Sequence, residues 1–255
     1  MRNYATAQAL GSRTTQCDAT AIHTAPDGSR AFALLDGIGD YRSVRDWTRT
    51  AARRVARAAS RRADAEAGLR HIYEGYAADP DRQDPYTLRY MPRAAAVVAV
   101  AVPGEPLKIA WCGDARAYLL TQGLARRLTE DHNLRRVYPP TARYPEGGDR
   151  NTITSYLGHA HSDVESMGRY NHPAIEATTV DVDGPARLVL ASDGAYEPHG
   201  EAGHDLFVEL AYEPLDEVAR DFVSLAVATS LRITAAEDPT RPYADNASAL
   251  LADLV

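Results

Sequence analysis

Short apolar runs recur along this 255-residue chain, and most of them adjoin an acidic turn. Runs of this length that are bounded by Gly and Asp are typical of buried strands ending in a turn. Four of them stand beside an acidic motif, at 31–35 before Asp36, 109–112 before Gly113, 188–191 before Ser192 and 247–251 after Asn246. Because a strand end is rigid, a carboxylate placed there is held in position.

The same pattern predicts the remaining strands and three helices. Two or three strands are expected within residues 4–36. Further strands are expected at 94–102, 107–112, 115–120, 175–182, 186–191 and 247–254. Apolar residues at spacings of three and four predict helices at 44–63 and 65–78, and another around 215–226. Ser43 and Asp46 are spaced as a capping box for the first of these helices.

Two polar stretches interrupt this pattern. Residues 79–92 are rich in Pro, Asp and Tyr and are expected to form a loop. Residues 133–173 contain Pro139-Pro140 and Gly147-Gly148 and are expected to form a mobile insertion. No long linker divides the rest, so residues 1–255 are predicted to form a single domain.

Composition argues against several classes of function. The net charge is −7 and the pI about 5.6, which disfavours binding to nucleic acid or to an anionic membrane. The longest apolar run, 94–102, is too short to span a bilayer, and no apolar signal segment follows Met1. Cys17 and Cys112 are too few for a disulfide framework. We therefore expect a cytoplasmic protein.

Seven short motifs occur in order from Gly11 to the last apolar run. They are Gly11-Ser12-Arg13 with Cys17-Asp18-Ala19, Asp36-Gly37-Ile38-Gly39, Gly113-Asp114-Ala115-Arg116-Ala117-Tyr118, Leu128-Thr129-Glu130-Asp131-His132, Ile153-Thr154-Ser155-Tyr156-Leu157-Gly158, Leu190-Ala191-Ser192-Asp193-Gly194 and Asp245-Asn246. Each motif alone is weak, because Asp-Gly pairs mark turns in most proteins. Together they resemble the metal-dependent serine/threonine protein phosphatases, the PPM or type 2C class, in their bacterial branch.

The resemblance implies a fold. Members of this class are α+β proteins built as a four-layer α-β-β-α sandwich, in which two antiparallel sheets are flanked by helix pairs. The strands and helices expected here agree with that architecture. The stretch at about 133–173 would be the flap-like insertion of the family, which shapes the choice of substrate.

The resemblance also implies a binuclear centre of Mn²⁺ or Mg²⁺. The ions would be held by Asp36, Asp193 and Asp245, with Asp36 as the bridge and the backbone carbonyl of Gly37 as a further ligand. All-oxygen ligation suits these hard cations better than Zn²⁺. A third ion is implied at Asp114, with Glu197 sharing it where the family usually has Asp.

Further residues receive roles from the same resemblance. Arg13 matches the arginine that binds the phosphate of the substrate, and its planar fork can hold two oxygens. Asp18 would support the metal ligands through bound water, and Asn246 would orient Asp245. Asp131 and His132 are expected to be a buried hydrogen-bonding pair.

The implied activity is hydrolysis of phosphoserine and phosphothreonine on proteins. A hydroxide that bridges the two ions would attack phosphorus without a phosphoenzyme. The substrates would be targets of bacterial serine/threonine kinases, and the enzyme would act as a monomer. Neither nucleic acid nor a membrane is an expected partner.

Two departures from the family pattern leave an alternative open. Cys17 stands where the family has Glu or Gln, and a neutral thiol is a poor ligand for Mg²⁺ or Mn²⁺. Ile38 stands where eukaryotic members have a His that can protonate the leaving group, a role that would then fall to bound water. The alternative is a weak or inactive pseudophosphatase that serves as a binding or regulatory module.

Two other chemistries are disfavoured. A cysteine phosphatase needs Cys-x5-Arg, but neither cysteine is followed by Arg at that spacing. His159, His161 and His172 could be imagined as a zinc cluster, but their polar surroundings predict that they are exposed.

Overall fold

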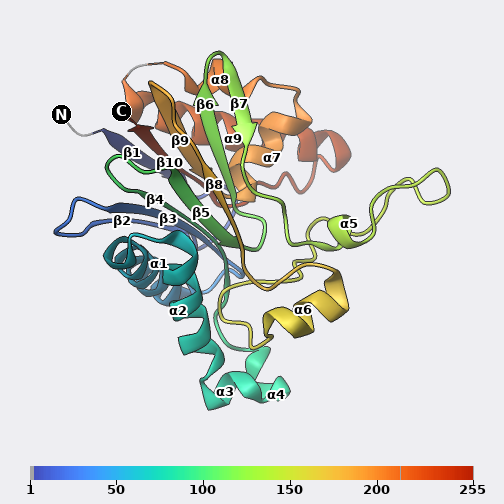
Figure 1. Ribbon diagram of the computed structural model, residues 1–255. Coiled ribbons are helices and arrows are strands. Elements are labelled where there is room, and N and C mark those ends of the chain that lie inside the picture. The colour runs from blue at the N-terminus through green and yellow to red at the C-terminus, as the bar shows by residue number, and fades with distance from the viewer. Residues whose placement is uncertain (1–2, 213, 255) are drawn as a thin grey trace.

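The computed structural model describes residues 3–212 and 214–254, and two five-stranded antiparallel sheets pack face to face within them (Figure 1). One sheet has the order β2-β3-β4-β5-β8, with strands Ala19–Thr24, Arg30–Gly37, Ala94–Ala101, Leu107–Cys112 and Glu176–Val180. The other has the order β1-β10-β9-β6-β7, with strands Tyr4–Ala9, Ala247–Leu254, Ala186–Ala191, Arg116–Thr121 and Leu124–Arg127.

Helices cover the outer face of each sheet. α1 (Arg42–Arg62) and α2 (Ala65–Ala77) pack on the first sheet, while α7 (Asp193–Glu201) and α9 (Leu215–Glu237) pack on the second (Figure 1). Five short helices complete the chain: α3 (Pro80–Gln83), α4 (Pro85–Leu88), α5 (Leu134–Val137), α6 (Asp163–Tyr170) and α8 (Leu206–Leu210). The predicted α+β sandwich of four layers is confirmed.

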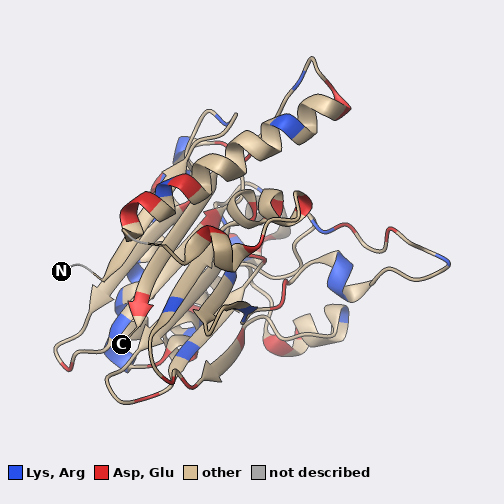
Figure 2. Cartoon of the chain, turned by 90° about the horizontal axis from the view of Figure 1, so that it is seen from above, with Lys and Arg blue, Asp and Glu red and all other residues tan. Residues whose placement is uncertain are grey.

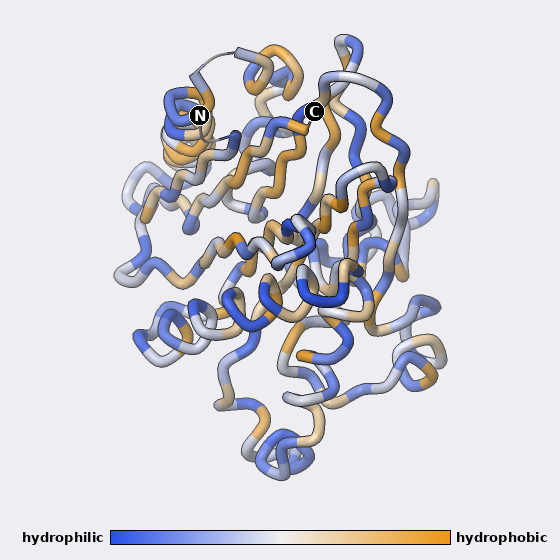
Figure 3. The backbone as a smooth tube through the Cα atoms, turned by 60° about the vertical axis from the view of Figure 1, so that its left-hand side comes forward, coloured by the Kyte–Doolittle hydropathy of each residue, from blue (hydrophilic) through white to orange (hydrophobic). Residues whose placement is uncertain are grey.

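Strand β3 shows how side-chain alternation builds two cores. Phe32 and Leu34 lie between the sheets, whereas Ala33 and Leu35 point to the opposite face, toward α1 and α2. Since both faces of the sheet are covered, β4 is apolar at every position instead of alternating. Full burial of a side chain such as Leu34 contributes about 1.5–3 kcal/mol. Figure 3 shows the same arrangement, with apolar strands inside and polar helices and loops outside.

The helix predictions hold except for the cap of the first helix. The expected helices at 44–63 and 65–78 are observed at Arg42–Arg62 and Ala65–Ala77, and the third runs much further than expected, to Glu237. The capping box is wrong, because α1 begins after Tyr41, which makes no side-chain cap bond. Ser43 therefore lies inside the first turn, where it cannot act as the N-cap.

Several elements were not predicted. Residues 79–92 were expected to be a loop, but α3 and α4 each begin at an Asp-Pro pair within it. In both helices the Asp side chain accepts a hydrogen bond from a backbone N–H of the first turn, and the Pro occupies that turn. Asp and Pro residues that are typical of turns therefore start helices here. Strand β7 and helices α7 and α8 were also missed.

Residues 133–173 hold α5, α6 and a loop after α5 that reaches away from the sandwich in both views (Figure 1, Figure 2). Backbone bonds between Ala94 and Leu157 fasten this segment to β4. The expectation of exposed histidines was wrong for His172, which is buried, bonds the Thr154 hydroxyl at 2.8 Å and stacks on His132. His159 and His161 are half-buried. The described helices include none long and apolar enough to cross a membrane.

The Asp131-His132 prediction was right about the burial of His132 and wrong about the pairing, and Asp131 is only partly buried. His132 is buried and contacts Glu176 at 2.9 Å instead of its neighbour. Asp131 accepts a forked pair of hydrogen bonds from Arg116, at 2.9 and 2.7 Å. Both interactions hold the turn beyond β5 in place, which supports a structural role.

Candidate metal centre

The acidic motifs converge on one cleft at the end of the two sheets. Asp36 ends β3, Asp114 lies in the turn between β5 and β6, Asp193 opens α7 after β9, and Asp245 precedes β10. All four line a cavity of about 770 Å³. Arg13, Gly37 and Glu197 line it as well, so the structure brings seven of the predicted site residues together.

Two glycines let the backbone approach the cluster closely. A Cβ atom on Gly37 would lie 2.4 Å from the carbonyl oxygen of Cys17. One on Gly194 would lie 2.2 Å from the carbonyl oxygen of Asn246. Real side chains do not fit at these distances, so each glycine allows its neighbouring aspartate to stand against another chain segment.

The carboxylates repel one another strongly. Burial, followed by the charges of Asp18 and Asp193, raises the pKa of Asp36 well above its ordinary value. Burial also raises the pKa of Asp18 to about 7, although the hydroxyls of Ser248 and Ser192 act in the opposite direction. The cluster thus carries more negative charge than its protein surroundings compensate.

Asp114 and Glu197 extend this acidic region. Burial and then the charge of Asp193 raise the pKa of Asp114 well above its ordinary range. The same two causes raise the pKa of Glu197 to about 7. Asp193 and Glu197 are four residues apart on α7, so they share one face of that helix.

Buried oxygens without partners show what would complete the site. Both carboxylate oxygens of Asp18 and Oδ1 of Asp114 are buried and form no hydrogen bond. A buried carboxylate oxygen without a partner is costly, and a bound cation with its waters would satisfy it. Because the surrounding donors are oxygens, the residues present fit hard cations such as Mg²⁺ or Mn²⁺.

Arg13 is the cation that faces this cluster. Its Nε and Nη2 atoms donate to the two oxygens of Asp245 at 2.7 and 2.6 Å. The loop that carries it is held by Asp40, whose carboxylate accepts the backbone N–H of Thr14 and of Thr15. Asp40 directly follows the Asp36 motif, but no local pattern indicates this positioning role.

A family model described as protein phosphatase 2C matches residues 9–137, which is just over half of the chain. The chain belongs to the protein phosphatase 2C family. The matched span includes Arg13, Asp36 and Asp114, whereas Asp193, Glu197 and Asp245 lie beyond it. A comparison with curated protein sequences found no significant match.

Solved bacterial phosphatases share the fold over nearly the whole chain. The S. agalactiae serine/threonine phosphatase is 19% identical, covers 97% of each chain and has a TM-score of 0.69. Stp1 from Staphylococcus aureus is 18% identical over 100% of this chain and 96% of its own, with a TM-score of 0.70. MsPP from Mycobacterium smegmatis is a PPM Ser-Thr phosphatase whose structure was solved in complex with cacodylate. It is 20% identical over 99% of this chain and 98% of its own, with a TM-score of 0.68.

Three predicted residues lie behind the cleft of this phosphatase 2C domain. Asp18 is buried next to the carboxylates. Cys17 is also buried, and its thiol faces the carbonyl oxygen of Tyr41 at 3.6 Å. Burial raises the pKa of this thiol, so it stays protonated and is a poor metal ligand.

Asn246 differs from its expected role in the phosphatase 2C centre. Its side chain accepts the backbone N–H of Cys17 at 2.8 Å and donates to the carbonyl of Leu10. Only its backbone N–H contacts Asp245, at 2.7 Å from Oδ1. The asparagine side chain therefore ties the β1–β2 loop to β10 instead of orienting the neighbouring carboxylate.

Several residues that line the phosphatase 2C cleft were not identified from the sequence, and two of them contact predicted site residues. Arg150, from the 133–173 segment, forms ion pairs with Glu197 at 3.4 Å and with Glu201. It therefore competes with any ion for Glu197. Tyr243 lies beside Arg13, whose guanidinium carbon is 5.5 Å from the ring centre. Both residues lie in loops, where no periodicity marks them.

Proposed function

We propose that this protein hydrolyses phosphoserine and phosphothreonine on proteins, with Mn²⁺ or Mg²⁺ held by the carboxylate cluster. The observation that carries the proposal is the convergence of four buried or half-buried aspartates on one cleft that also contains Arg13, with Asp18 buried behind them. The four are Asp36, Asp114, Asp193 and Asp245. A cluster of this kind is stable in its charged form only with bound cations.

Each group at the cleft has a proposed task. Asp36, Asp193 and Asp245, with the carbonyl of Gly37, would hold two ions, and Asp114 with Glu197 would hold a third. Bound ions would activate water as the nucleophile and neutralise the charge of the phosphate. Asp18 would accept hydrogen bonds from waters bound to the two ions of the main centre. These waters would be the partners that its buried carboxylate oxygens lack.

Direct attack by water fits the residues of the cleft better than a phosphoenzyme. The described residues that line it include neither cysteine nor histidine. The hydroxyls of Ser230 and Thr234 are both directed to the carbonyl oxygen of Tyr243, at 3.0 and 2.9 Å. These hydroxyls have no basic partner that would make them nucleophiles.

The phosphate would be bound by Arg13. Ions that take the oxygens of Asp245 compete with Arg13 for the same carboxylate and leave its planar fork free for two phosphate oxygens. Arg150, Asn151 and Ile153 line the cleft from the 133–173 segment. This flap-like segment would therefore shape the choice among phosphoproteins, which we infer to be targets of bacterial serine/threonine kinases.

The test is hydrolysis of p-nitrophenyl phosphate and of a phosphothreonine peptide by the purified protein. Turnover is expected with Mn²⁺ or Mg²⁺ and is expected to stop when a chelator removes the ion. Folded protein that turns over neither substrate with either ion would contradict the proposal. The chain would then be a binding module with the phosphatase fold. Cys17, which stands where the family has Glu or Gln, is the feature that favours this alternative.

Replacing Arg13 by Ala is expected to lower kcat/KM by about 10²–10³-fold, because the charge that develops on the phosphate loses its forked donor. Arg13→Lys should recover little, since an ammonium group cannot form the fork. The measurement is steady-state hydrolysis of the phosphothreonine peptide at saturating Mn²⁺. Arg57→Ala, an exposed arginine on α1, is the matched control, and equal activity in the two alanine variants would rule out phosphate binding by Arg13.

A further inference from the structure

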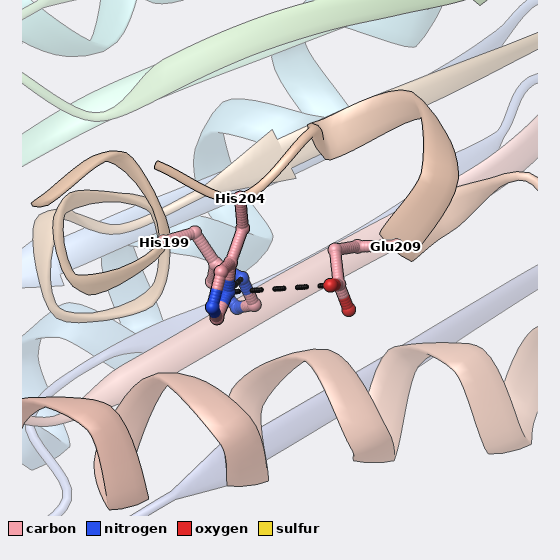
Figure 4. Close-up of side chains that lie close together, drawn as sticks. All are labelled: His199, His204 and Glu209. Atoms are coloured by element: carbon pink, nitrogen blue, oxygen red, sulfur yellow. Dashed lines mark hydrogen bonds and ion pairs between the residues drawn. The ribbon is translucent and has the colours of Figure 1, made fainter. Parts of the chain in front are cut away.

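A second group of metal-binding side chains lies on the far side of α7 from the acidic cleft. Figure 4 shows His199 on α7, His204 in the loop that follows and Glu209 on α8, all directed toward one point. One ligand atom from each lies within 4.8 Å of the others. Residues 197 and 199 are two apart on a helix, so His199 points roughly opposite to Glu197, which faces the cleft.

The geometry of the two histidines suits a shared ion. Nδ1 of His199 lies 3.1 Å from Nδ1 of His204. Two imidazole nitrogens on one tetrahedral Zn²⁺, each about 2.0–2.1 Å from the ion, are separated by about 3.3–3.4 Å. Oε1 of Glu209 is 4.0 Å from Nδ1 of His204, so closure by roughly 0.6 Å would bring it to the same spacing.

The surrounding structure orients these ligands in advance. His199 is buried, its ring stacks on Phe222 and its Nε2 lies 3.0 Å from the carbonyl oxygen of Phe222. A carbonyl can only accept, so Nε2 carries the proton and Nδ1 of the neutral ring presents its lone pair toward Nδ1 of His204. This is the arrangement of a metal-bound histidine whose second nitrogen donates to the backbone.

The main chain also fixes the other two ligands. The backbone N–H of His204 donates to the carbonyl of His199 at 2.9 Å, which closes the end of α7. Asp205 then caps α8 by accepting the N–H of Phe207 at 2.8 Å, and α8 carries Glu209. The side chains of His204 and Glu209 are 27% and 29% exposed, so a fourth coordination position is open to water.

We propose that His199, His204 and Glu209 bind Zn²⁺ at a site separate from the acidic centre. Two imidazoles and one carboxylate favour this borderline ion, whereas the all-oxygen cleft favours Mg²⁺ or Mn²⁺. Bound zinc would join the end of α7 to α8, and through Phe222 to α9. It would thereby fix the helix whose first turn carries Asp193.

The test measures Zn²⁺ binding by competition with a chromogenic chelator, in excess Mg²⁺ and in an Asp36→Asn background that weakens the acidic centre. One tight equivalent of Zn²⁺ is expected. His204→Gln should weaken it by more than about 100-fold, since it removes a ligand rather than an outer partner. His71→Gln, an exposed histidine on α2, is the matched control and should bind as the background protein does.

Two further readouts keep the result clear. Zinc X-ray absorption should show scattering from two imidazole rings, and a hundredfold excess over Kd should raise Tm by roughly 5–10 °C. If His204→Gln does not fold, Glu209→Gln takes its place. Absence of a tight equivalent, or equal binding by His204→Gln and His71→Gln, would overturn the proposal and leave a hydrogen-bonded His–His–Glu array. Neither outcome depends on phosphatase activity.

Discussion

Asp193→Asn is expected to remove most of the phosphatase activity while making the metal-free protein more stable. The amide keeps the size of the side chain and can still accept the N–H of Gly194, which now lies 2.5 Å from Oδ1. It loses the charge that would hold the ions. Loss of one ligand from a site that contributes several kcal/mol to the transition state lowers kcat by about 10³-fold or more.

The gain in stability has the same origin. Burial and then the charge of Asp245 raise the pKa of Asp193, and its own charge raises that of Asp36 and Asp114 in turn. Removing one charge relieves this repulsion, so the free energy of unfolding without metal should rise.

Activity in saturating Mn²⁺ and urea unfolding in chelator measure the two effects. Asp221→Asn, an exposed residue of α9, makes the same change in charge and should alter neither. An Asp193→Asn protein that retains activity would show that the cleft is not the catalytic centre. One that loses both activity and stability would instead show that Asp193 is a structural carboxylate.

The acidic centre could be predicted because each ligand adjoins a local pattern. Asp36 and Asp193 follow runs of buried strand residues, and Asp245 precedes one. Strand ends of an antiparallel sheet lie at two opposite ends, and it was the family resemblance carried by the ordered motifs that implied one shared centre for these carboxylates. Antiparallel pairing of β10 with β9 then brings the segments of Asp245 and Asp193 to the same end.

The contacts that complete the cleft could not be predicted, because they join loops distant in sequence. Arg150 reaches Glu197 and Glu201 from a segment without periodicity. Asp40 directly follows the Asp36 motif, yet its contact with Thr14 depends on how two loops fold together. The His199–His204 pair depends on how α7 ends, and α7 itself was not predicted. Pairings of this kind follow from tertiary packing and leave no local signal.

In the metal-free protein, the acidic cluster is expected to favour folding less and less as the pH rises from about 4 to about 7. Burial raises the pKa of Asp18 to about 7 in the fold, against an ordinary value of 3.8. The folded state therefore binds the proton more tightly than the unfolded state does. The resulting stability is complete below the ordinary pKa and is lost as the pH passes through the raised one.

Urea unfolding in chelator across this pH range, compared between the wild type and Asp18→Asn, measures the effect, and the stability advantage of the variant should grow toward pH 7. Excess Mg²⁺ or Mn²⁺ should abolish or reverse the trend, because a cation replaces the protons and binds more tightly as the carboxylates ionise. A difference between the wild type and Asp18→Asn that does not grow from pH 4 to pH 7 would mean that the protein itself stabilises Asp18 as an anion. In that case the fold would not need ions at this cleft, and the argument for a metal centre would lose its physical basis.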